Sequence, residues 1–227
     1  MPKVRYLCVR FSQNLFAYDI PKFRAAVIEK TERVASLFHN HLDDQKVIYR
    51  YPLIQYKINH KKASIVCLDA GVDDIHYLLQ HRDMNLRIGA ESYSFEVDNI
   101  DLHYHQVQIW NSLFDYSLMN WLALSQKNHL AFKELEGDDQ GQVDLLHRIL
   151  CGNLLSFAKG INWQVEERIK LEITQIKEIK MINFKGQDCL AFTLNFRCNV
   201  SLPDYVGLGK GSSVGFGVVK LLNDEKK

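Results

Sequence analysis

The chain reads Gly207-Leu-Gly-Lys-Gly-Ser-Ser-Val-Gly-Phe-Gly217 near its C-terminal end, with five glycines in eleven residues. Because glycine has no Cβ, such a run can adopt positive φ angles and lets another backbone or a ligand approach closely. Its successive N–H groups are typical of loops that cradle a phosphate. Lys210 and the hydroxyl groups of Ser212 and Ser213 would add further bonds to that anion. The sequence Val-Val-Lys-Leu-Leu follows at 218–222 and predicts a β-strand, which places the loop against a sheet.

Two well-known glycine motifs do not fit this loop. A P-loop needs Gly-Lys followed by Ser or Thr and then a helix, whereas Lys210 is followed by Gly211 and then a strand. A dinucleotide fingerprint needs a third glycine where Ser212 stands. A glycine-rich hairpin before an edge strand is the purely structural alternative.

Length and composition indicate a soluble globular protein. The 227 residues suffice for one large domain or two small ones, and the 47% hydrophobic and 24% charged content is ordinary. Five cysteines, an odd number without CxxC spacing, favour reduced thiols in the cytoplasm. No apolar run resembles a signal peptide or a membrane span, so we expect no membrane association.

Charge is distributed unevenly along the chain although its net value is only +1. Residues 20–62 contain nine Lys or Arg against four Asp or Glu, and residues 180–227 contain seven against four. Between them, residues 63–179 contain nine against eighteen. A basic surface can therefore coexist with a nearly neutral protein, although a chance division of surface charge gives the same numbers.

The first half of the chain predicts the element order β-α-β-β-α-β. Alternating apolar residues indicate that the first strand is partly buried on both faces, and Pro21 suits the first turn of the helix that follows. The expected elements are a strand at 3–11, a helix beginning at Phe23, a β-rich segment at 47–59, a turn at 59–62, a strand at 63–68, a helix at 72–81 and a closing strand at 85–88. This is the order of a ferredoxin-like unit.

The second half predicts a similar unit. Residues 91–110 are strand-like, residues 143–161 carry an apolar stripe at helical spacing, and residues 169–184 and 188–200 form a hairpin. The apolar segment 111–135 is left unassigned. We predict an α+β fold of tandem ferredoxin-like, RRM-like domains at 1–100 and 101–227, the second of which carries the glycine loop.

The glycine loop and the tandem pattern, together with two further blocks, resemble the CRISPR repeat-processing endoribonucleases of the RAMP superfamily. These blocks are Phe38-His-Asn-His41 and Tyr49-Arg-Tyr-Pro-Leu-Ile-Gln-Tyr-Lys57. The sequence Phe23-Arg24-Ala25 resembles a Phe-Arg-Gly of that family, with Ala25 in place of glycine. The likeness spans nearly the whole chain, and its specific parts are the glycine loop and residues 38–57.

The resemblance implies cleavage of precursor CRISPR RNA within each repeat, without metal or cofactor, to give a 2′,3′-cyclic phosphate and a 5′-hydroxyl. This chemistry needs a general base, a general acid and positive charge near the phosphorus, and histidine suits both proton transfers. The family places one or two histidines after the first helix, with a lysine and a tyrosine nearby. The matching positions are His39 and His41 for proton transfer, Lys30 for charge and Tyr49 for the 2′-hydroxyl. The sequence does not show which histidine is the general acid and which is the general base.

CRISPR repeat RNA is accordingly the expected partner, and other CRISPR effector proteins or a second copy of the chain are left open as further ones. Stacking candidates are Tyr51, Tyr56 and Phe216. The expected RNA-binding residues are Gly207, Gly209, Lys210, Gly211, Ser212, Ser213, Gly215, Gly217, Arg24, Arg50 and Lys57.

Three alternatives remain at the level of sequence. The first alternative is a non-catalytic RNA-binding member of the RAMP superfamily that holds guide RNA within an effector complex. Asp101, His103 and His105 suggest a metal-dependent hydrolase, although alternation along a strand explains this spacing without a metal. The glycine loop would also suit a regulatory module that binds a small phosphorylated ligand.

Overall fold

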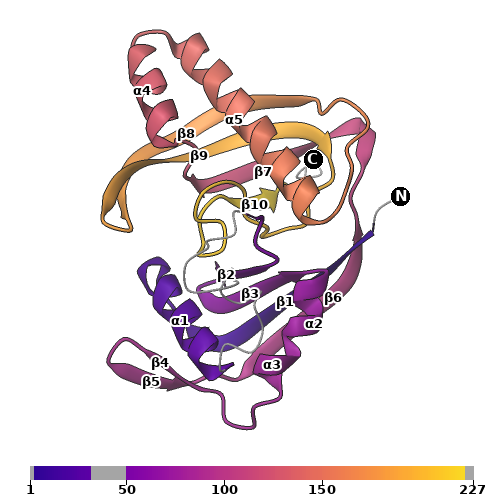
Figure 1. The fold of residues 1–227 in the computed structure, drawn as a ribbon, viewed down its shortest axis with the longest axis vertical. Helices are drawn as coiled ribbons and strands as arrows, with labels where there is room; N and C mark the ends of the chain where they lie inside the picture. The colour runs from indigo at the N-terminus through magenta and orange to yellow at the C-terminus, as the bar shows by residue number, and fades with distance from the viewer. Residues whose placement is uncertain (1–2, 32–49, 223–227) are drawn as a thin grey trace, which may run out of the picture.

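The computed structural model of the chain describes residues 3–31 and 50–222. They form two units that lie one above the other, and the glycine loop lies between them (Figure 1). Each unit contains a four-stranded antiparallel sheet, with strand orders β2-β3-β1-β6 and β10-β7-β9-β8. Both orders are those of a ferredoxin-like unit, so the predicted tandem ferredoxin-like fold is confirmed.

The N-terminal unit has its helices on one face of its sheet (Figure 1). Leu7, Val9 and Phe11 point from β1 toward this helical layer, where they pack with Phe23 and Val27 of α1. The elements are β1 (Lys3–Asn14), the 3₁₀ helix η1 (Ala17–Asp19), α1 (Ile20–Lys30), β2 (Ile54–Asn59), β3 (Lys62–Leu68), α2 (Ala70–Asp74), α3 (His76–Leu79), β4 (Asn85–Ile88), β5 (Glu91–Ser94) and β6 (Val97–Gln106).

The fourth strand of this sheet is β6, and the prediction that residues 85–88 close the unit is wrong. Those residues form β4, which pairs only with β5 in a separate two-stranded sheet. β6 instead pairs antiparallel with β1 from Lys3↔Gln106 to Arg10↔Asn99. A four-residue strand offers little pairing surface, whereas the ten residues of β6 can follow most of β1. The predicted domain boundary at residue 100 lies within β6.

The C-terminal unit packs its helices on one face of a strongly curved sheet (Figure 1). The segment that the sequence left unassigned contains most of β7 and all of α4. Side chains cap both helix starts, because Ser125 Oγ accepts from Asn128 N–H and Asp138 Oδ1 accepts from Gly141 N–H. The elements are β7 (Ile109–Trp121), α4 (Gln126–Glu134), α5 (Asp139–Gly160), β8 (Leu171–Phe184), β9 (Gln187–Val200) and β10 (Val218–Leu221).

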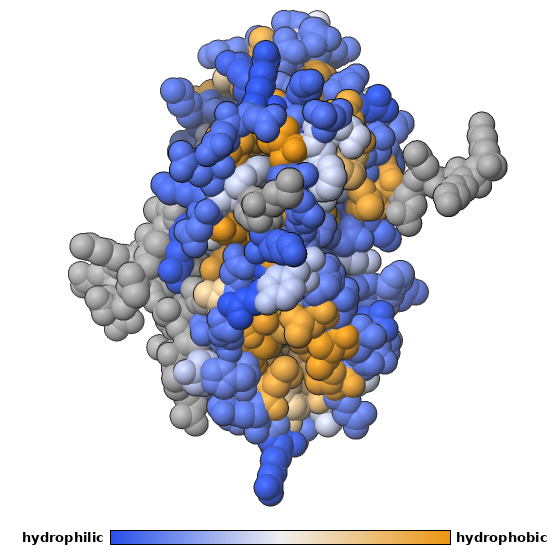
Figure 2. Space-filling view, turned by 90° about the vertical axis from the view of Figure 1, so that its right-hand side faces the viewer, coloured by the Kyte–Doolittle hydropathy of each residue, from blue (hydrophilic) through white to orange (hydrophobic). Residues whose placement is uncertain are grey.

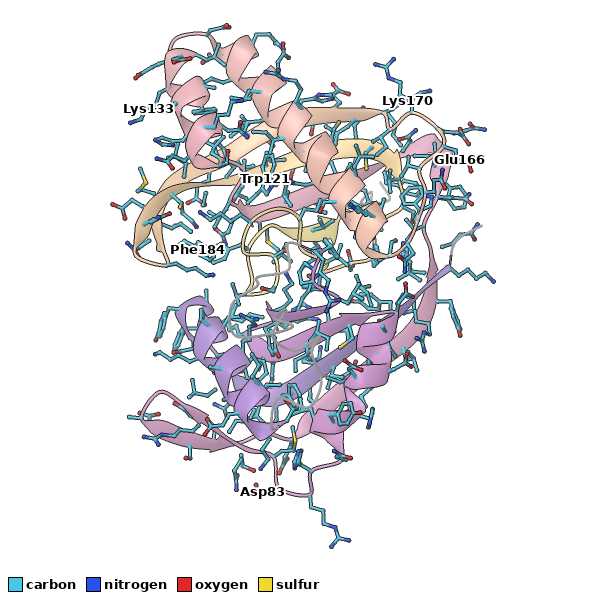
Figure 3. All side chains as sticks on the ribbon, viewed as in Figure 1. Asp83, Trp121, Lys133, Glu166, Lys170 and Phe184 are labelled. Atoms are coloured by element: carbon cyan, nitrogen blue, oxygen red, sulfur yellow. The ribbon has the colours of Figure 1, made fainter. Side chains whose placement is uncertain are left out.

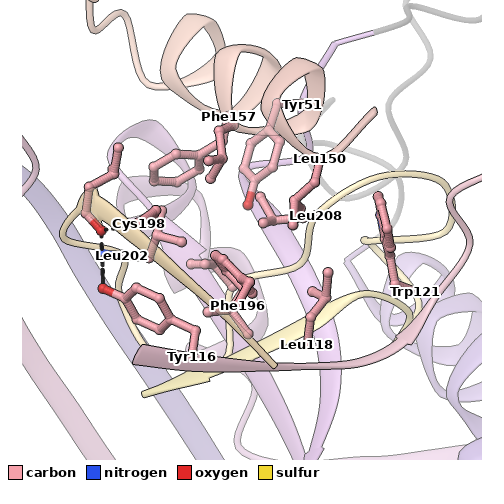
Figure 4. Close-up of a cluster of buried hydrophobic side chains, with 14 of the residues drawn as sticks. Tyr51, Tyr116, Leu118, Trp121, Leu150, Phe157, Phe196, Cys198, Leu202 and Leu208 are labelled. Carbon is pink, nitrogen blue, oxygen red and sulfur yellow. Dashed lines mark hydrogen bonds between the residues drawn. The ribbon is translucent and has the colours of Figure 1, made fainter. Parts of the chain in front are cut away.

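One apolar core joins the two units. Val4, Tyr6 and Cys8 point from β1 away from the N-terminal helices and enter the same buried cluster as Leu150 and Phe157 of α5. Figure 4 shows part of this cluster, in which the Tyr116 hydroxyl accepts a hydrogen bond from the Leu202 N–H at 2.8 Å. The shared core fixes the two sheets, and therefore the glycine loop between them, relative to one another.

Candidate functional site

The glycine loop is bound to β2 of the other unit by three consecutive residues. Gln55 Oε1 accepts from Gly207 N–H at 2.8 Å, Tyr56 N–H donates to the Ser213 carbonyl at 2.9 Å, and Lys57 Nζ donates to the Ser212 carbonyl at 2.6 Å. Tyr56 also forms a parallel β-bridge with Val214. The loop therefore extends the edge of the N-terminal sheet while it belongs to the C-terminal unit.

Several N–H groups of the loop are used inside the protein. Leu208 N–H donates to the Gly217 carbonyl, Gly217 N–H donates to the Asn120 carbonyl, and Val214 and Phe216 both donate to the Gly211 carbonyl. In this conformation these N–H groups are therefore not available to a phosphate. The glycines serve close packing as well: a Cβ on Gly209 would lie 2.7 Å from Trp121 Nε1.

Lys57 is fully buried beneath the loop, so it does not reach RNA directly in this conformation. The sequence predicts an RNA contact for Lys57 because of its charge, but its Nζ donates the hydrogen bond that holds the Ser212 carbonyl. Burial lowers the pKa of Lys57 to about 7, from an ordinary value of 10.5. This lysine is therefore a structural link between the two units.

We expect the wild type to become more stable as the pH rises above 7, and we expect Lys57→Met to lose this increase. Between pH 7 and 10.5 the unfolded chain binds one proton that the folded chain does not, because the folded pKa is the lower one. The free energy of unfolding of the wild type should therefore increase with pH, by up to about 1.4 kcal/mol per pH unit, relative to that of Lys57→Met. Urea unfolding of both proteins at several pH values in this window measures the difference.

The control for this prediction is Lys220→Met, because Lys220 is exposed on β10. It should follow the pH dependence of the wild type. If Lys57→Met also keeps the wild-type dependence, Lys57 is charged throughout the window and the burial argument is wrong.

The outer side of the loop forms a small basic and aromatic surface with the β8–β9 hairpin. Lys210 is exposed, and its Nζ lies 5.3 Å from the ring centroid of Phe184. Phe184 also contacts Phe216, with ring centroids 5.2 Å apart, and Lys185 lies beside it at the turn. Figure 3 shows Phe184 at the end of the hairpin, on the side of the loop. Sequence reasoning missed Phe184 and Lys185, because only the folded hairpin brings them to the loop.

Lys30 is the last residue of α1. Its Nζ lies 3.8 Å from Asp83 Oδ2, and it lines a hollow of about 400 Å³ together with Glu29, His81 and Arg87. The predicted catalytic residues His39, His41 and Tyr49 lie outside the described residues. The helix end that carries Lys30 leads directly into the segment that contains them.

The remaining predicted contacts are dispersed. Arg24 lies half-buried in α1 on the N-terminal unit. Arg50 is exposed beside the C-terminal end of α5, where it shares a hollow of about 310 Å³ with Lys159. Tyr51 and Tyr56 are buried in the two cores and cannot stack on RNA bases, which leaves half-buried Phe216 of the three aromatic candidates.

The second histidine pair lies on β6, where it faces a hollow of about 300 Å³ next to the C-terminal unit. His103 Nδ1 lies 3.0 Å from Asp101 Oδ1, while His105 Nε2 lies 3.0 Å from Ser201 Oγ. Burial lowers the pKa of His105. Across residues 3–31 and 50–222, no three His, Cys, Asp or Glu side chains converge as metal ligands. The geometry thus gives the metal-hydrolase alternative no support.

Comparison with known proteins decides the family. A model of the Cas6b N-terminal domain matches residues 2–107, and a model of the Cas6b C-terminal domain matches residues 108–222. The chain belongs to the Cas6b family. A crystal structure of Cas6b superposes with a TM-score of 0.89 and 26% identity, over 97% of this chain and all of that chain.

Two further relatives extend this comparison. A structure described as the CRISPR RNA processing endoribonuclease Cas6b superposes with a TM-score of 0.75 and 24% identity, over 97% of this chain and all of that one, which shows the same Cas6b fold. The uncharacterized protein MJ0978 of Methanocaldococcus jannaschii is 32% identical over 143 residues, which are 63% of this chain and 94% of that protein.

Each helix within the described residues is too short or too polar to cross a bilayer.

Proposed function

We propose that this protein is an endoribonuclease that cleaves precursor CRISPR RNA within its repeats. The observation that carries the proposal is the match of the two Cas6b family models, which together cover residues 2–222. The Cas6b structure described as a CRISPR RNA processing endoribonuclease shares the fold, which adds support. The five cysteines are all free thiols, which suits the cytoplasm as the proposed location.

The proposed reaction uses only groups of the protein and the RNA. A general base removes the proton of a ribose 2′-hydroxyl, and the 2′-oxygen attacks the adjacent phosphorus. The bond from phosphorus to the 5′-oxygen breaks, and a general acid protonates that oxygen. The products are a 2′,3′-cyclic phosphate and a 5′-hydroxyl. We assign the proton transfers to His39 and His41, orientation of the 2′-hydroxyl to Tyr49 and stabilisation of the developing negative charge to Lys30.

We propose that the RNA contacts the outer side of the glycine loop. Lys210 and Lys185 supply positive charge there, and the half-buried rings of Phe184 and Phe216 supply apolar surface beside it. The glycines and serines of the loop position this surface, and Lys57 acts through the Ser212 carbonyl. Arg24 and Arg50 are proposed to contact phosphates farther along the strand.

Cleavage of repeat RNA is expected to persist in excess EDTA, with a rate within about twofold of the metal-containing reaction, because no metal ion takes part. A single 2′-deoxy substitution at the nucleotide whose 2′-oxygen attacks should abolish cleavage, because it removes the nucleophile. The assay uses end-labelled repeat RNA and identifies the cyclic phosphate by mass spectrometry.

The matched control carries the 2′-deoxy substitution one nucleotide away and should be cut at the normal rate. Loss of cleavage in EDTA, with recovery on adding Mg²⁺, would contradict the metal-independent mechanism. Tight binding without any cutting would instead identify an RNA-holding subunit.

A further inference from the structure

β6 presents a long sheet edge that pairs with no other strand in the described part of the chain. It is the outer strand of the order β2-β3-β1-β6, and it is ten residues long. Its pairing with β1 is in continuous register from Arg10↔Asn99 to Lys3↔Gln106, so no bulge twists this stretch away. A regular free edge of this kind offers a row of N–H and C=O groups to another strand.

Two of the other outer strands, β2 and β8, carry protection that β6 lacks. The edge of β2 is covered by the glycine loop through the Tyr56–Ser213 hydrogen bond. β8 carries Lys177, Glu178 and Lys180, and its pairing with β9 contains two register shifts. β6 reads Val-Asp-Asn-Ile-Asp-Leu-His-Tyr-His-Gln, without lysine, arginine, proline or glycine. Lysine, proline and bulges are the usual means of blocking edge-to-edge association.

β6 also carries an apolar stripe in solvent. Ile100, Leu102 and Tyr104 are 53%, 62% and 68% exposed, and Val97 continues the stripe. They point to the helical face of the sheet, because Ile100 and Leu102 pair with Val9 and Leu7, which lie under the helices. The helix α2 packs on β1 and β3, so the helical layer ends before β6. Figure 2 shows hydrophobic side chains gathered on this side of the N-terminal unit.

We propose that β6 pairs antiparallel with β6 of a second copy of the chain, about a two-fold axis at Leu102. The two four-stranded sheets would then form one continuous sheet. The apolar stripes of the two copies would lie side by side on the helical face. Because the interface is one strand pair and not a large buried core, we expect a dissociation constant on the order of micromolar.

With Leu102 opposite Leu102, the side chains of the two β6 strands are complementary to one another, which favours a second copy of the chain over another partner. Leu102 faces Leu102, Ile100 faces Tyr104 of the other copy, and Asp101 faces its His103. The apolar pairs lie on the helical face, and two carboxylate–imidazole pairs lie on the opposite face. Both Asp101 and His103 have about half of their side chains exposed, so they are accessible to a second copy. Cross-strand pairs of this kind stabilise antiparallel sheets.

Neighbouring registers fit less well. A shift by two positions in one direction sets Asp101 against Asp101 of the other copy, which places like charges directly opposite one another. The opposite shift sets His103 against His103 and places Ile100 against Gln106. Only the register centred on Leu102 pairs every apolar residue of the central stripe with another apolar residue.

Sedimentation velocity from about 1 to about 200 μM tests the dimer. The wild type should show a monomer–dimer equilibrium, and Leu102→Lys should weaken it at least tenfold, because it places two ammonium groups at the axis. Met181→Lys is the matched control, since Met181 is 59% exposed on β8, the outer strand of the other sheet. It should leave the equilibrium unchanged. Both changes are on the surface, so thermal unfolding should confirm that both variants fold.

Cysteine cross-linking tests the register. Leu102→Cys should form an intermolecular disulfide on mild oxidation, because the two thiols would face one another across the axis. Ile100→Cys faces Tyr104 in this register and should cross-link much less, and the wild type reports the background of the five native cysteines. A monomer at all concentrations, a dimer that Leu102→Lys leaves intact, or equal cross-linking of the two cysteine variants would overturn the proposal.

Discussion

Alanine in place of His39 or His41 is expected to slow cleavage of repeat RNA by about 10²- to 10⁴-fold, which is the usual contribution of general acid–base catalysis. Affinity for the repeat should stay within about threefold of the wild type, because an imidazole that transfers a proton contributes little to ground-state binding. Single-turnover kinetics with saturating protein measures the first quantity, and a filter-binding assay with the 2′-deoxy RNA measures the second.

The double variant sharpens this test. If the two histidines act as one acid–base pair, removing both should cost little more than removing the more important one, because groups that act as a unit are not additive. His129→Ala is the control, since His129 lies in α4 of the C-terminal unit, whereas α1 belongs to the other unit (Figure 1). Cleavage by both single variants at the wild-type rate would place the proton transfers on other residues and would contradict the assignment taken from the resemblance.

Much of the fold could be predicted from the sequence, because local periodicity reports burial directly. The helix expected at 143–161 is α5, Asp139–Gly160, since the spacing of Leu146, Leu150, Leu154 and Phe157 needs no tertiary information. The choice between β4 and β6 as the closing strand failed for the opposite reason. Both segments have strand character, and only the pairing with β1, far away in the chain, decides which one joins the sheet.

In the candidate site too, the local feature could be predicted from the sequence and the long-range contact could not. The glycine loop was recognisable from composition alone, but its contact with β2 was not, because the Lys57–Ser212 bond joins residues 155 positions apart. A lysine in a basic segment is ordinarily exposed, so sequence reasoning placed Lys57 on the RNA. The roles of His39, His41 and Tyr49 rest on the resemblance, since these residues lie in the part of the chain that the structure does not describe.

Gly217→Ala is expected to lower the free energy of unfolding by about 3 kcal/mol or more, among the largest effects of a single substitution. Gly217 has a φ of +58°, and a Cβ there would lie 1.9 Å from the Leu208 carbonyl oxygen. That contact is with backbone, so no rotamer change relieves it. The two ends of the glycine loop meet at this point, where Leu208 N–H donates to the Gly217 carbonyl at 2.8 Å. Urea unfolding of the variant measures the cost.

Gly137→Ala separates the two causes of this loss of stability, which are the strain of a positive φ and the clash of the new Cβ with backbone. Gly137 also has a positive φ, +90°, but a Cβ there meets nothing within 4 Å. Its cost should be about 1 kcal/mol, from backbone strain alone. Only Gly217→Ala should weaken binding of repeat RNA, because only that change moves the segment that carries Lys210. Equal destabilisation by the two substitutions would mean that the loop ends can separate freely. In that case the role of the glycines would be to make the loop flexible. It would not be to let the two ends of the loop pack closely, as we infer here.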